Sequence, residues 1–376
     1  MDKIYNFTNI ASHYRSLLWQ KLISESKFEY HFFFGRNKGL QIKEIDFKTE
    51  FFLRFKDRLH KINNFWLREK VLLWQSGVII RCFKDEIHTA IFLGEFQVLS
   101  TWIAMFICKF RGIQVVYWTH GLYGNESTWK RIVRVLFYKT ADKLLLYERR
   151  GKALLVEQGL NESKIEVIYN SLDYDTHLKL RDELKISNKI DTTLFDKELP
   201  YLIFIGRLTA VKKIELLIQV LANINRTEPK LNLLILGDGE IKSQLMELAE
   251  ENKIAQYVNF YGACYDEELI GKYIYNSVLC VSPGNVGLTA IHSLSFGTPV
   301  CTHSNLCNQM PEVEVIQEGV TGCLFEENNI KSLEKSILNL VENDKDRETI
   351  RCNCYQVIDE LYNPYNQLEV IKSLIK

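Results

Sequence analysis

The sequence has little proline and no long uninterrupted apolar run. Its 6 Pro and 19 Gly among 376 residues exclude a collagen-like or linker-dominated chain. The longest apolar stretch, Val98–Phe110, is shorter than the roughly 20 residues that a membrane-spanning helix needs. The amino-terminal residues show no apolar core followed by a cleavage site, so we expect no signal peptide.

Closely spaced cysteine pairs of the zinc-binding type are also absent. The nine Cys include no C-x-x-C pair, which argues against a zinc site or a thioredoxin-like motif. Cys280 and Cys323 stand inside apolar runs, where Cys usually behaves as a small buried hydrophobe. We therefore expect reduced cysteines in a cytoplasmic protein.

The net charge is zero, but the charges are distributed unevenly. Residues 1–150 carry 25 Lys+Arg and 14 Asp+Glu, a net of +11. The remaining residues carry 47 − 25 = 22 basic and 47 − 14 = 33 acidic side chains, a net of −11. The basic first part indicates an anionic partner, and no nucleic-acid-binding motif accompanies it.

Short apolar runs alternate with amphipathic segments, which is typical of an α/β protein with parallel sheets. We predict strands at Tyr30–Phe34, Ile87–Leu93, Gln114–Trp118, Lys143–Tyr147, Ile165–Tyr169, Tyr201–Ile205, Leu231–Leu236, Val258–Tyr261, Val278–Val281 and Pro299–Thr302. We predict helices at Tyr14–Ser24, Phe51–Gln75, Val98–Phe110, Lys130–Thr140, Lys212–Ile224, Glu240–Glu251, Asp266–Tyr275, Gly287–Phe296 and Asn363–Lys376.

This alternation predicts two Rossmann-like domains joined by a polar connection. The expected boundaries are an N-terminal domain at 1–172, a linker at 173–199, a C-terminal domain at 200–355 and a closing helix at 356–376.

The motif with the clearest chemistry follows the strand at Tyr201–Ile205. There Gly206 would let a ligand approach the backbone, Arg207 could bind phosphate oxygens through its fork, and Lys212 adds a point charge. The carboxyl edge of a parallel sheet is where α/β folds bind ligands. The simpler alternative to a phosphate site is that Arg207 and Lys212 are surface cations at a solvated helix start. The turn at Gly237–Gly239 and the strand end at Gly262 are further places where a ligand could approach the backbone. The presence of Asp238 in the first of these is explained by the preference of Asp for turns.

A second motif runs from Val278 to Val300. A buried strand leads into a glycine-containing loop, and the helix after it would begin with unpaired amides that favour phosphate. We expect this loop and helix start to contact a phosphate-bearing ligand, at Asn285, Val286, Gly287 and Leu288. His292 lies inside the helix, where a packed histidine is as reasonable as a ligand contact.

In order and spacing, these motifs resemble the donor domain of the retaining GT-B glycosyltransferases of family four (glycosyl transferases group 1). Gly206, Arg207 and Lys212 match its G-R-L-x-x-x-K motif, and Gly237–Gly239 match its G-D-G motif. Asn285–Leu288 and Gly297–Val300 match its last loop and helix. The resemblance implies two Rossmann-like domains facing a central cleft, a nucleotide-sugar donor, and Arg207 and Lys212 on its diphosphate without a metal ion or other cofactor.

Two departures from the family pattern concern carboxylates. The family usually carries two Glu residues eight positions apart, one at the donor sugar and one at the ribose; Gly284 and His292 occupy these positions. We predict that His292 still contacts the donor, with one hydrogen bond where a carboxylate makes two. Lys213 stands where a Gly is common.

The first half carries weaker candidates. His120, at a strand end before Gly121, resembles the family's T-x-H-G turn, which implies a place near the donor sugar; an ordinary turn is the alternative. His13 and Arg15 are weak acceptor-site candidates. Cations interleaved with aromatic residues across Phe51–Trp74 suggest a helix lying on an anionic membrane, or an amphipathic helix packed on the sheet.

The resemblance therefore implies a retaining glycosyltransferase of the hexosyltransferase type, acting in surface polysaccharide assembly. Its acceptor would be a glycan or lipid-linked glycan at the inner face of the cell membrane. The alternatives are a nucleotide-sugar epimerase of the same fold, or an inactive homologue that binds a nucleotide or a protein.

Overall fold

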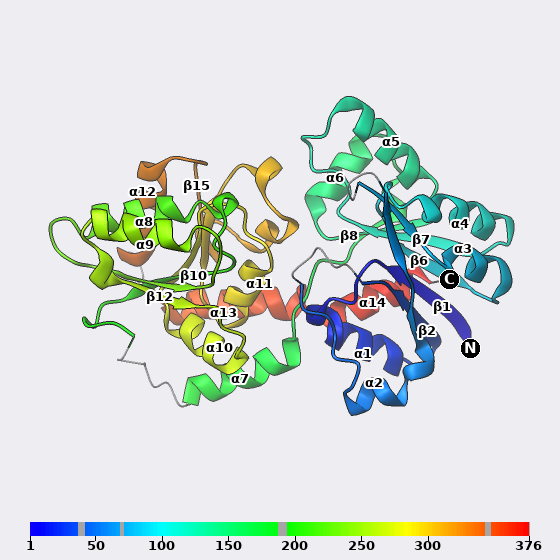
Figure 1. Ribbon diagram of the computed structural model, residues 1–376, viewed down its shortest axis with the longest axis horizontal. Coiled ribbons are helices and arrows are strands. Elements are labelled where there is room, and N and C mark those ends of the chain that lie inside the picture. The colour runs from blue at the N-terminus through cyan, green and yellow to red at the C-terminus, as the bar shows by residue number, and fades with distance from the viewer. Residues whose placement is uncertain (37–41, 68–70, 187–193, 343–346, 376) are drawn as a thin grey trace. The chain divides into compact units, whose positions relative to one another are not determined.

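The chain folds into two compact units, each built around one parallel β-sheet (Figure 1). The computed structural model describes residues 1–36, 42–67, 71–186, 194–342 and 347–375. Unit 1 comprises Met1–Asp173 and Asn363–Lys376, and unit 2 comprises Tyr174–Tyr362. The two sheets confirm the predicted α/β class with two Rossmann-like halves. Among the described residues, no helix combines the length and the apolar character that crossing a bilayer demands.

Unit 1 contains a seven-stranded sheet in the order β3-β2-β1-β6-β7-β8-β9. Its strands are β1 (Asp2–Thr8), β2 (Phe28–Phe34), β3 (Leu59–Lys61), β6 (Thr89–Leu93), β7 (Gln114–Thr119), β8 (Lys143–Leu146) and β9 (Ile165–Val167). Its helices are α1 (Ser16–Ser24), α2 (Glu50–Arg54), α3 (Val78–Lys84), α4 (Leu99–Phe110), α5 (Thr128–Lys139), α6 (Arg149–Glu157) and α14 (Pro364–Leu374). Side chains from both faces of the sheet are buried, so the strands read as near-continuous apolar runs.

Unit 2 contains a six-stranded sheet in the order β12-β11-β10-β13-β14-β15. Its strands are β10 (Tyr201–Ile205), β11 (Asn232–Leu236), β12 (Val258–Gly262), β13 (Leu279–Ser282), β14 (Val300–His303) and β15 (Gly322–Phe325). Its helices are α7 (Tyr174–Ile186), α8 (Ile214–Ile224), α9 (Lys242–Glu251), α10 (Glu267–Asn276), α11 (Leu288–Ser295), α12 (Ile330–Glu342) and α13 (Arg347–Glu360). Counted along the unit, this is the 3-2-1-4-5-6 order of a doubly wound Rossmann sheet.

Each sheet has a point where the direction of winding reverses. In unit 1, β1 lies between β2 and β6; in unit 2, β10 lies between β11 and β13. Open α/β sheets bind ligands in the crevice outside the carboxyl ends of the two strands at that point. The topology therefore selects the residues that follow β1 and β6 in unit 1, and those that follow β10 and β13 in unit 2.

The prediction of one helix over Phe51–Gln75 was wrong. Among the described residues of this stretch, only Glu50–Arg54 is α-helical, and Asn64–Leu67 (β4) pairs antiparallel with Leu72–Gln75 (β5). The spacing of the aromatic and basic residues predicts one helix. The apolar runs at residues 66–67 and 71–74, however, are short enough to form strands. The cations Arg68 and Lys70 lie outside the described residues.

The central strand of unit 1, β1, is absent from the elements predicted from the sequence. Asp2–Thr8 pairs with both β2 and β6, and its last five residues are buried. The strand carries Asn6 and Thr8 among its buried residues, which interrupts the apolar run that signals a parallel strand.

The two ends of unit 2 differ from the predicted boundaries. Part of the predicted linker, Tyr174–Ile186, is helix α7, which packs on α10 and α11 within unit 2. At the other end α13 continues to Glu360, so unit 2 extends to Tyr362. The chain then returns to unit 1 as α14, the predicted last helix, which packs against α1.

Helix α14 is fastened to unit 1 by a buried polar contact and an apolar face. Gln367 donates from Nε2 to the Tyr169 carbonyl (3.0 Å) and accepts from Ser171 Oγ (2.6 Å). Ile371 and Leu374 are buried in the core that includes Trp19.

We predict that Ile371→Ala lowers the free energy of unfolding of unit 1 by about 2–5 kcal/mol, because it removes buried methyl groups and leaves a cavity. Urea unfolding followed by intrinsic fluorescence measures this change. Glu369→Ala, on the exposed face of the same helix, is the control and should change the free energy by less than about 0.5 kcal/mol. Equal effects of the two substitutions would show that α14 is not part of the unit 1 core.

Candidate functional site

At the winding reversal in unit 2, three strands end in glycines that bring their backbones together. The Gly206 amide donates to the Leu236 carbonyl (3.0 Å), and the Gly237 amide donates to the Gly262 carbonyl (2.8 Å). A Cβ on Gly237 would lie 1.9 Å from the Gly206 carbonyl oxygen, so no side chain fits there. Gly206 has φ +149° and Gly262 has φ +95°, a region that L side chains rarely adopt. At these three positions, the strand ends carry no side chain and their backbones can lie close together.

The loop after β10 and the loop after β13 are joined at Lys212. Its Nζ donates to the Asn285 carbonyl (2.7 Å) and to Asn285 Oδ1 (2.9 Å), and its own carbonyl accepts from the Gly284 amide (2.9 Å). A Cβ on Gly284 would lie 2.0 Å from the Val211 carbonyl oxygen. The absence of a carboxylate at position 284 therefore has a steric reason in this chain, because the two loops approach too closely for any side chain.

The electrostatics at Lys212 favour an added negative charge. Burial and the neighbouring positive charge of Arg207 lower the pKa of Lys212, and the buried Glu312 acts in the opposite direction. Arg207 itself is exposed. An anion bound beside these two cations would relieve their repulsion.

Helix α11 begins directly after this loop, at Leu288, with Gly287 preceding it. The Val286 amide is already bonded to Gln309 Oε1 (2.8 Å), so a ligand could use that amide only by displacing Gln309. The amides of the first helical turn have no carbonyl four residues back to accept from them, and they carry the positive end of the helix dipole. Gly287 and Leu288 therefore present backbone donors at the same edge as Arg207 and Lys212.

Lys213 is held away from this group of cations. Its backbone is left-handed, with φ +50°, which explains why a glycine suits this position. Its Nζ contacts Glu327 Oε1 and Asn328 Oδ1, each at 2.7 Å.

His292 lies in a cluster with two other helices rather than among the loop residues. Its Nε2 is 2.5 Å from Glu267 Oε1, and His177 Nε2 approaches the same oxygen at 2.8 Å. Neither partner is among the residues predicted from the sequence.

The winding reversal in unit 1 forms a cleft of about 260 Å³, whose lining includes Thr8, Arg15, Glu95, His120 and Tyr147. Arg15 packs its guanidinium over the Trp118 ring, 4.7 Å from the centroid, and hydrogen-bonds to the Tyr147 hydroxyl. The His120 ring lies 4.7 Å from the Tyr147 ring. The structure thus brings together two predicted site residues, Arg15 and His120. His13 is exposed in the same short 3-10 turn and is not part of this cleft lining.

The surroundings of His120 and Glu95 both favour the neutral form. Burial, and then the positive charges of Arg15 and Arg134, lower the pKa of His120 to about 4. His120 Nδ1 is buried and has no hydrogen-bond partner among the described residues. Burial raises the pKa of Glu95, against the attraction of Arg134 at 4.0 Å. A neutral imidazole and a weakly acidic carboxyl group can each exchange hydrogen bonds with a sugar hydroxyl.

Glu95, Gln309 and Glu312 are site residues that the sequence prediction missed. Glu95 has a usable signal, because it follows Gly94 at the end of a predicted strand, as Arg207 follows Gly206. Gln309 and Glu312 come from a region of 3-10 turns whose position depends on long-range packing. No local pattern could have placed them at Val286 and Lys212.

Comparison with known protein families finds a match that lies within unit 2. Residues 185–357 match the sequence profile of the family "Glycosyl transferases group 1". This segment is therefore similar to a Glycosyl transferases group 1 domain. It contains Arg207, Lys212 and the whole of the loop that precedes α11.

Relatives and solved structures extend the likeness. An uncharacterized 41.2 kDa protein in the cps region of Klebsiella pneumoniae is 26% identical over 67% of this chain and 70% of its own length. The chain spans 60 to 70% of the length of the first curated relatives that it matches. Among solved structures, the lipopolysaccharide outer core galactosyltransferase WaaB is similar with a TM-score of 0.69 and 16% identity, covering 99% of both chains. Anabaena Alr3699/HepE in complex with UDP is similar with a TM-score of 0.68 and 15% identity. The match covers 100% of this chain and 99% of the HepE chain. The fold is that of the GT-B glycosyltransferases.

The environment of His120 predicts a specific dependence of stability on pH. Its pKa of about 4 lies below the value of about 6.5 expected in the unfolded chain, so the unfolded state binds more protons between these values. The contribution of this neutral histidine is therefore complete above pH about 6.5 and is lost as the pH falls toward 4. We predict that His120→Gln reduces the loss of unfolding free energy between pH 6.5 and 4, measured by urea titration. Identical slopes for the two proteins would contradict this prediction, and above pH about 7.5 their difference should be constant.

Proposed function

We propose that the protein is a retaining hexosyltransferase that moves a sugar from a nucleotide-sugar donor to a glycan or lipid-linked glycan. The observation that carries the proposal is the pairing of Arg207 with Lys212 beside the start of α11, at the winding reversal of a segment similar to a group 1 domain. HepE, which shares the fold, is solved in complex with UDP, and this supports a nucleoside diphosphate at the corresponding edge of this chain.

The proposed chemistry uses these cations on the leaving group. As the bond between the anomeric carbon and the diphosphate oxygen breaks, negative charge grows on that oxygen, and Arg207 and Lys212 stabilise it. The acceptor hydroxyl attacks from the same face of the sugar and gives its proton to the departing phosphate oxygen. The configuration is then retained, and no metal ion is required in the step.

Unit 1 would hold the acceptor. The cleft with Arg15, Glu95 and His120 offers a cation, a protonatable carboxyl and a neutral imidazole, a set suited to sugar hydroxyls and an anionic carrier. The names of the Klebsiella relative, from a cps region, and of the lipopolysaccharide enzyme WaaB support a role in surface polysaccharide assembly.

We also propose that unit 1 rests on an anionic membrane surface, through helix α5. Trp129, Ile132 and Leu136 are 60%, 53% and 56% exposed, and their spacing puts them on one side of the helix. Lys139 is exposed on the same side. Apolar residues flanked by cations suit the headgroup boundary of an anionic bilayer. This surface takes the place of the single helix expected over residues 51–74, where the described residues include the strands β4 and β5.

We predict that Arg207→Ala and Lys212→Met each lower kcat at least 100-fold while leaving the thermal unfolding midpoint within a few degrees. The reason is that each removes a charge that stabilises the leaving diphosphate, and removal of one such group typically costs about 10²–10³ in kcat. Release of nucleoside diphosphate from a screen of nucleotide sugars measures the rate. Arg226→Ala removes an exposed cation elsewhere in unit 2 and should act like the wild type.

Product analysis by mass spectrometry and NMR separates the proposed function from its alternatives. Transfer or slow hydrolysis with release of nucleoside diphosphate supports the transferase. An interconverted nucleotide sugar would identify an epimerase instead, and binding without turnover of any donor would identify a binding protein. Unchanged kinetics of Arg207→Ala would remove Arg207 from the site.

For the membrane surface, we predict that the protein floats with vesicles containing phosphatidylglycerol and that Trp129→Ser/Leu136→Ser weakens this binding at least tenfold. Each side chain loses burial worth about 1.5–3 kcal/mol when it is replaced by a small polar one. Met246→Ser, an exposed apolar position in unit 2, is the matched control. Equal flotation of the double variant and the wild type would show that α5 is not the contact surface.

A further inference from the structure

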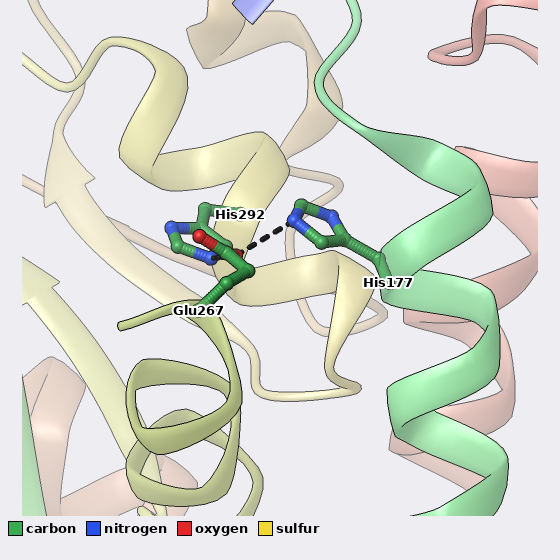
Figure 2. A group of neighbouring side chains, drawn as sticks. All are labelled: His177, Glu267 and His292. Carbon is green, nitrogen blue, oxygen red and sulfur yellow. Dashed lines mark hydrogen bonds and ion pairs between the residues drawn. The ribbon is translucent and has the colours of Figure 1, made fainter. Parts of the chain in front are cut away.

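Three helices of unit 2 direct a histidine, a glutamate and a second histidine toward one point (Figure 2). His177 comes from α7, Glu267 from the first turn of α10 and His292 from α11. Both imidazole Nε2 atoms approach Glu267 Oε1, His177 at 2.8 Å and His292 at 2.5 Å. The three ligand atoms lie within 4.8 Å of one another.

The two imidazoles are held in a fixed orientation. Their rings are nearly parallel, with an interplanar angle of 10° and centroids 5.0 Å apart. The Phe296 ring packs against both of them, at 5.1 Å from His177 and 5.7 Å from His292. This packing orders the donor atoms before any ligand arrives and gives them an apolar wall.

The three side chains of the cluster differ in their exposure to solvent. The side chains of His177 and His292 are 4% and 14% exposed, whereas that of Glu267 is 37% exposed. The carboxylate of Glu267 therefore has solvent on one side, while both imidazoles are enclosed by protein.

Two imidazole nitrogens and one carboxylate oxygen are a ligand set that suits divalent first-row transition metals. Zn²⁺ is bound by two His and one Glu at about 2.0–2.2 Å from each donor atom, with water in an open fourth position. The two Nε2 atoms already point at the place that Glu267 Oε1 occupies. If the partly exposed carboxylate moved by about 2 Å and the imidazoles closed slightly, an ion could take that place and keep the oxygen as its third ligand.

We propose that His177, Glu267 and His292 form a binding site for one divalent transition-metal ion, represented by Zn²⁺. The ion would fasten α7, the first helix of unit 2, to α10 and α11. Because α11 starts at the candidate phosphate site, the ion would also fix the position of that helix. This role is structural, and it stands whether or not the protein transfers sugars.

The test measures metal binding directly, on the full chain freed of metal with EDTA and then dialysed. Equilibrium dialysis against Zn²⁺ with elemental analysis should give one ion per chain. Co²⁺ should produce visible d–d absorption bands of a site with fewer than six ligands. At about a hundredfold excess of free Zn²⁺ over Kd, the melting temperature of unit 2 should rise by about 5–10 °C.

Two variants keep the proposal falsifiable. His292→Ala should abolish the stoichiometric uptake and the Co²⁺ bands, and Glu267→Gln, which keeps the size and shape of a partly exposed side chain, should weaken binding at least tenfold. His88→Ala, in unit 1, is the matched control and should bind like the wild type. Circular dichroism checks that each variant is folded.

Two results would overturn the proposal. One is the absence of stoichiometric binding by the folded wild type. The other is binding that survives in both His292→Ala and Glu267→Gln, which would assign the ion to other groups such as the cysteines. Neither result bears on the proposed transferase, whose test is the kinetics of Arg207→Ala.

Discussion

The close contact between the Gly284 amide and the Lys212 carbonyl sets the geometry of the candidate donor site. It joins the loops that follow the two central strands of unit 2, and Lys212 completes the contact by donating to Asn285. With the loops joined, Lys212 is fixed beside Arg207, and α11 starts within the same small region. The contact leaves no room for a Cβ at position 284. The close approach of these two loops thus explains two features, the position of Lys212 and the absence of a carboxylate at position 284.

Unit 1 uses the same topology with different chemistry. Its winding reversal gathers Arg15, Glu95 and His120 in one cleft, where burial and nearby charge set the protonation of the titratable groups. The guanidinium of Arg15 is buried against Trp118 and bonded to Tyr147, and its positive charge helps to keep His120 neutral. The cleft therefore combines a permanent cation with neutral hydrogen-bonding groups, whereas the edge in unit 2 presents two cations and helix amides. The first combination suits hydroxyl groups, and the second suits a diphosphate.

The second sheet can be predicted from the sequence more completely than the first, for a physical reason. Strand β10 and helix α8 have long apolar runs bounded by Gly206 and Lys213, and both lie within two residues of their predicted positions. Strand β1 was missed because Asn6 and Thr8 interrupt its apolar pattern, and the prediction for Phe51–Gln75 was wrong because aromatic residues occur in helices and strands alike. The contacts of the candidate site divide in the same way between those that a local sequence pattern predicts and those that it does not. Arg207 and Lys212 could be identified from a local motif, while Glu312 and Gln309 reach the site only through long-range packing.

The carboxylates of unit 2 explain how the domain departs from the family pattern that its motifs resemble. No acidic side chain stands at 284 or 292, yet Glu312 acts on Lys212 and Glu267 lies against His292. Both acids come from segments outside the loop and helix in which the family carries its own pair. Glu312 is buried and acts on Lys212 against Arg207, so the net positive charge at this edge is smaller than Arg207 and Lys212 alone would give. Glu267, by contrast, is bound to two imidazoles, which fixes His292 toward α7 and α10. Unit 2 therefore keeps two cations and the helix amides at its carboxyl edge, while His292, at the position of the second Glu in the family pattern, lies against Glu267 of α10 and His177 of α7.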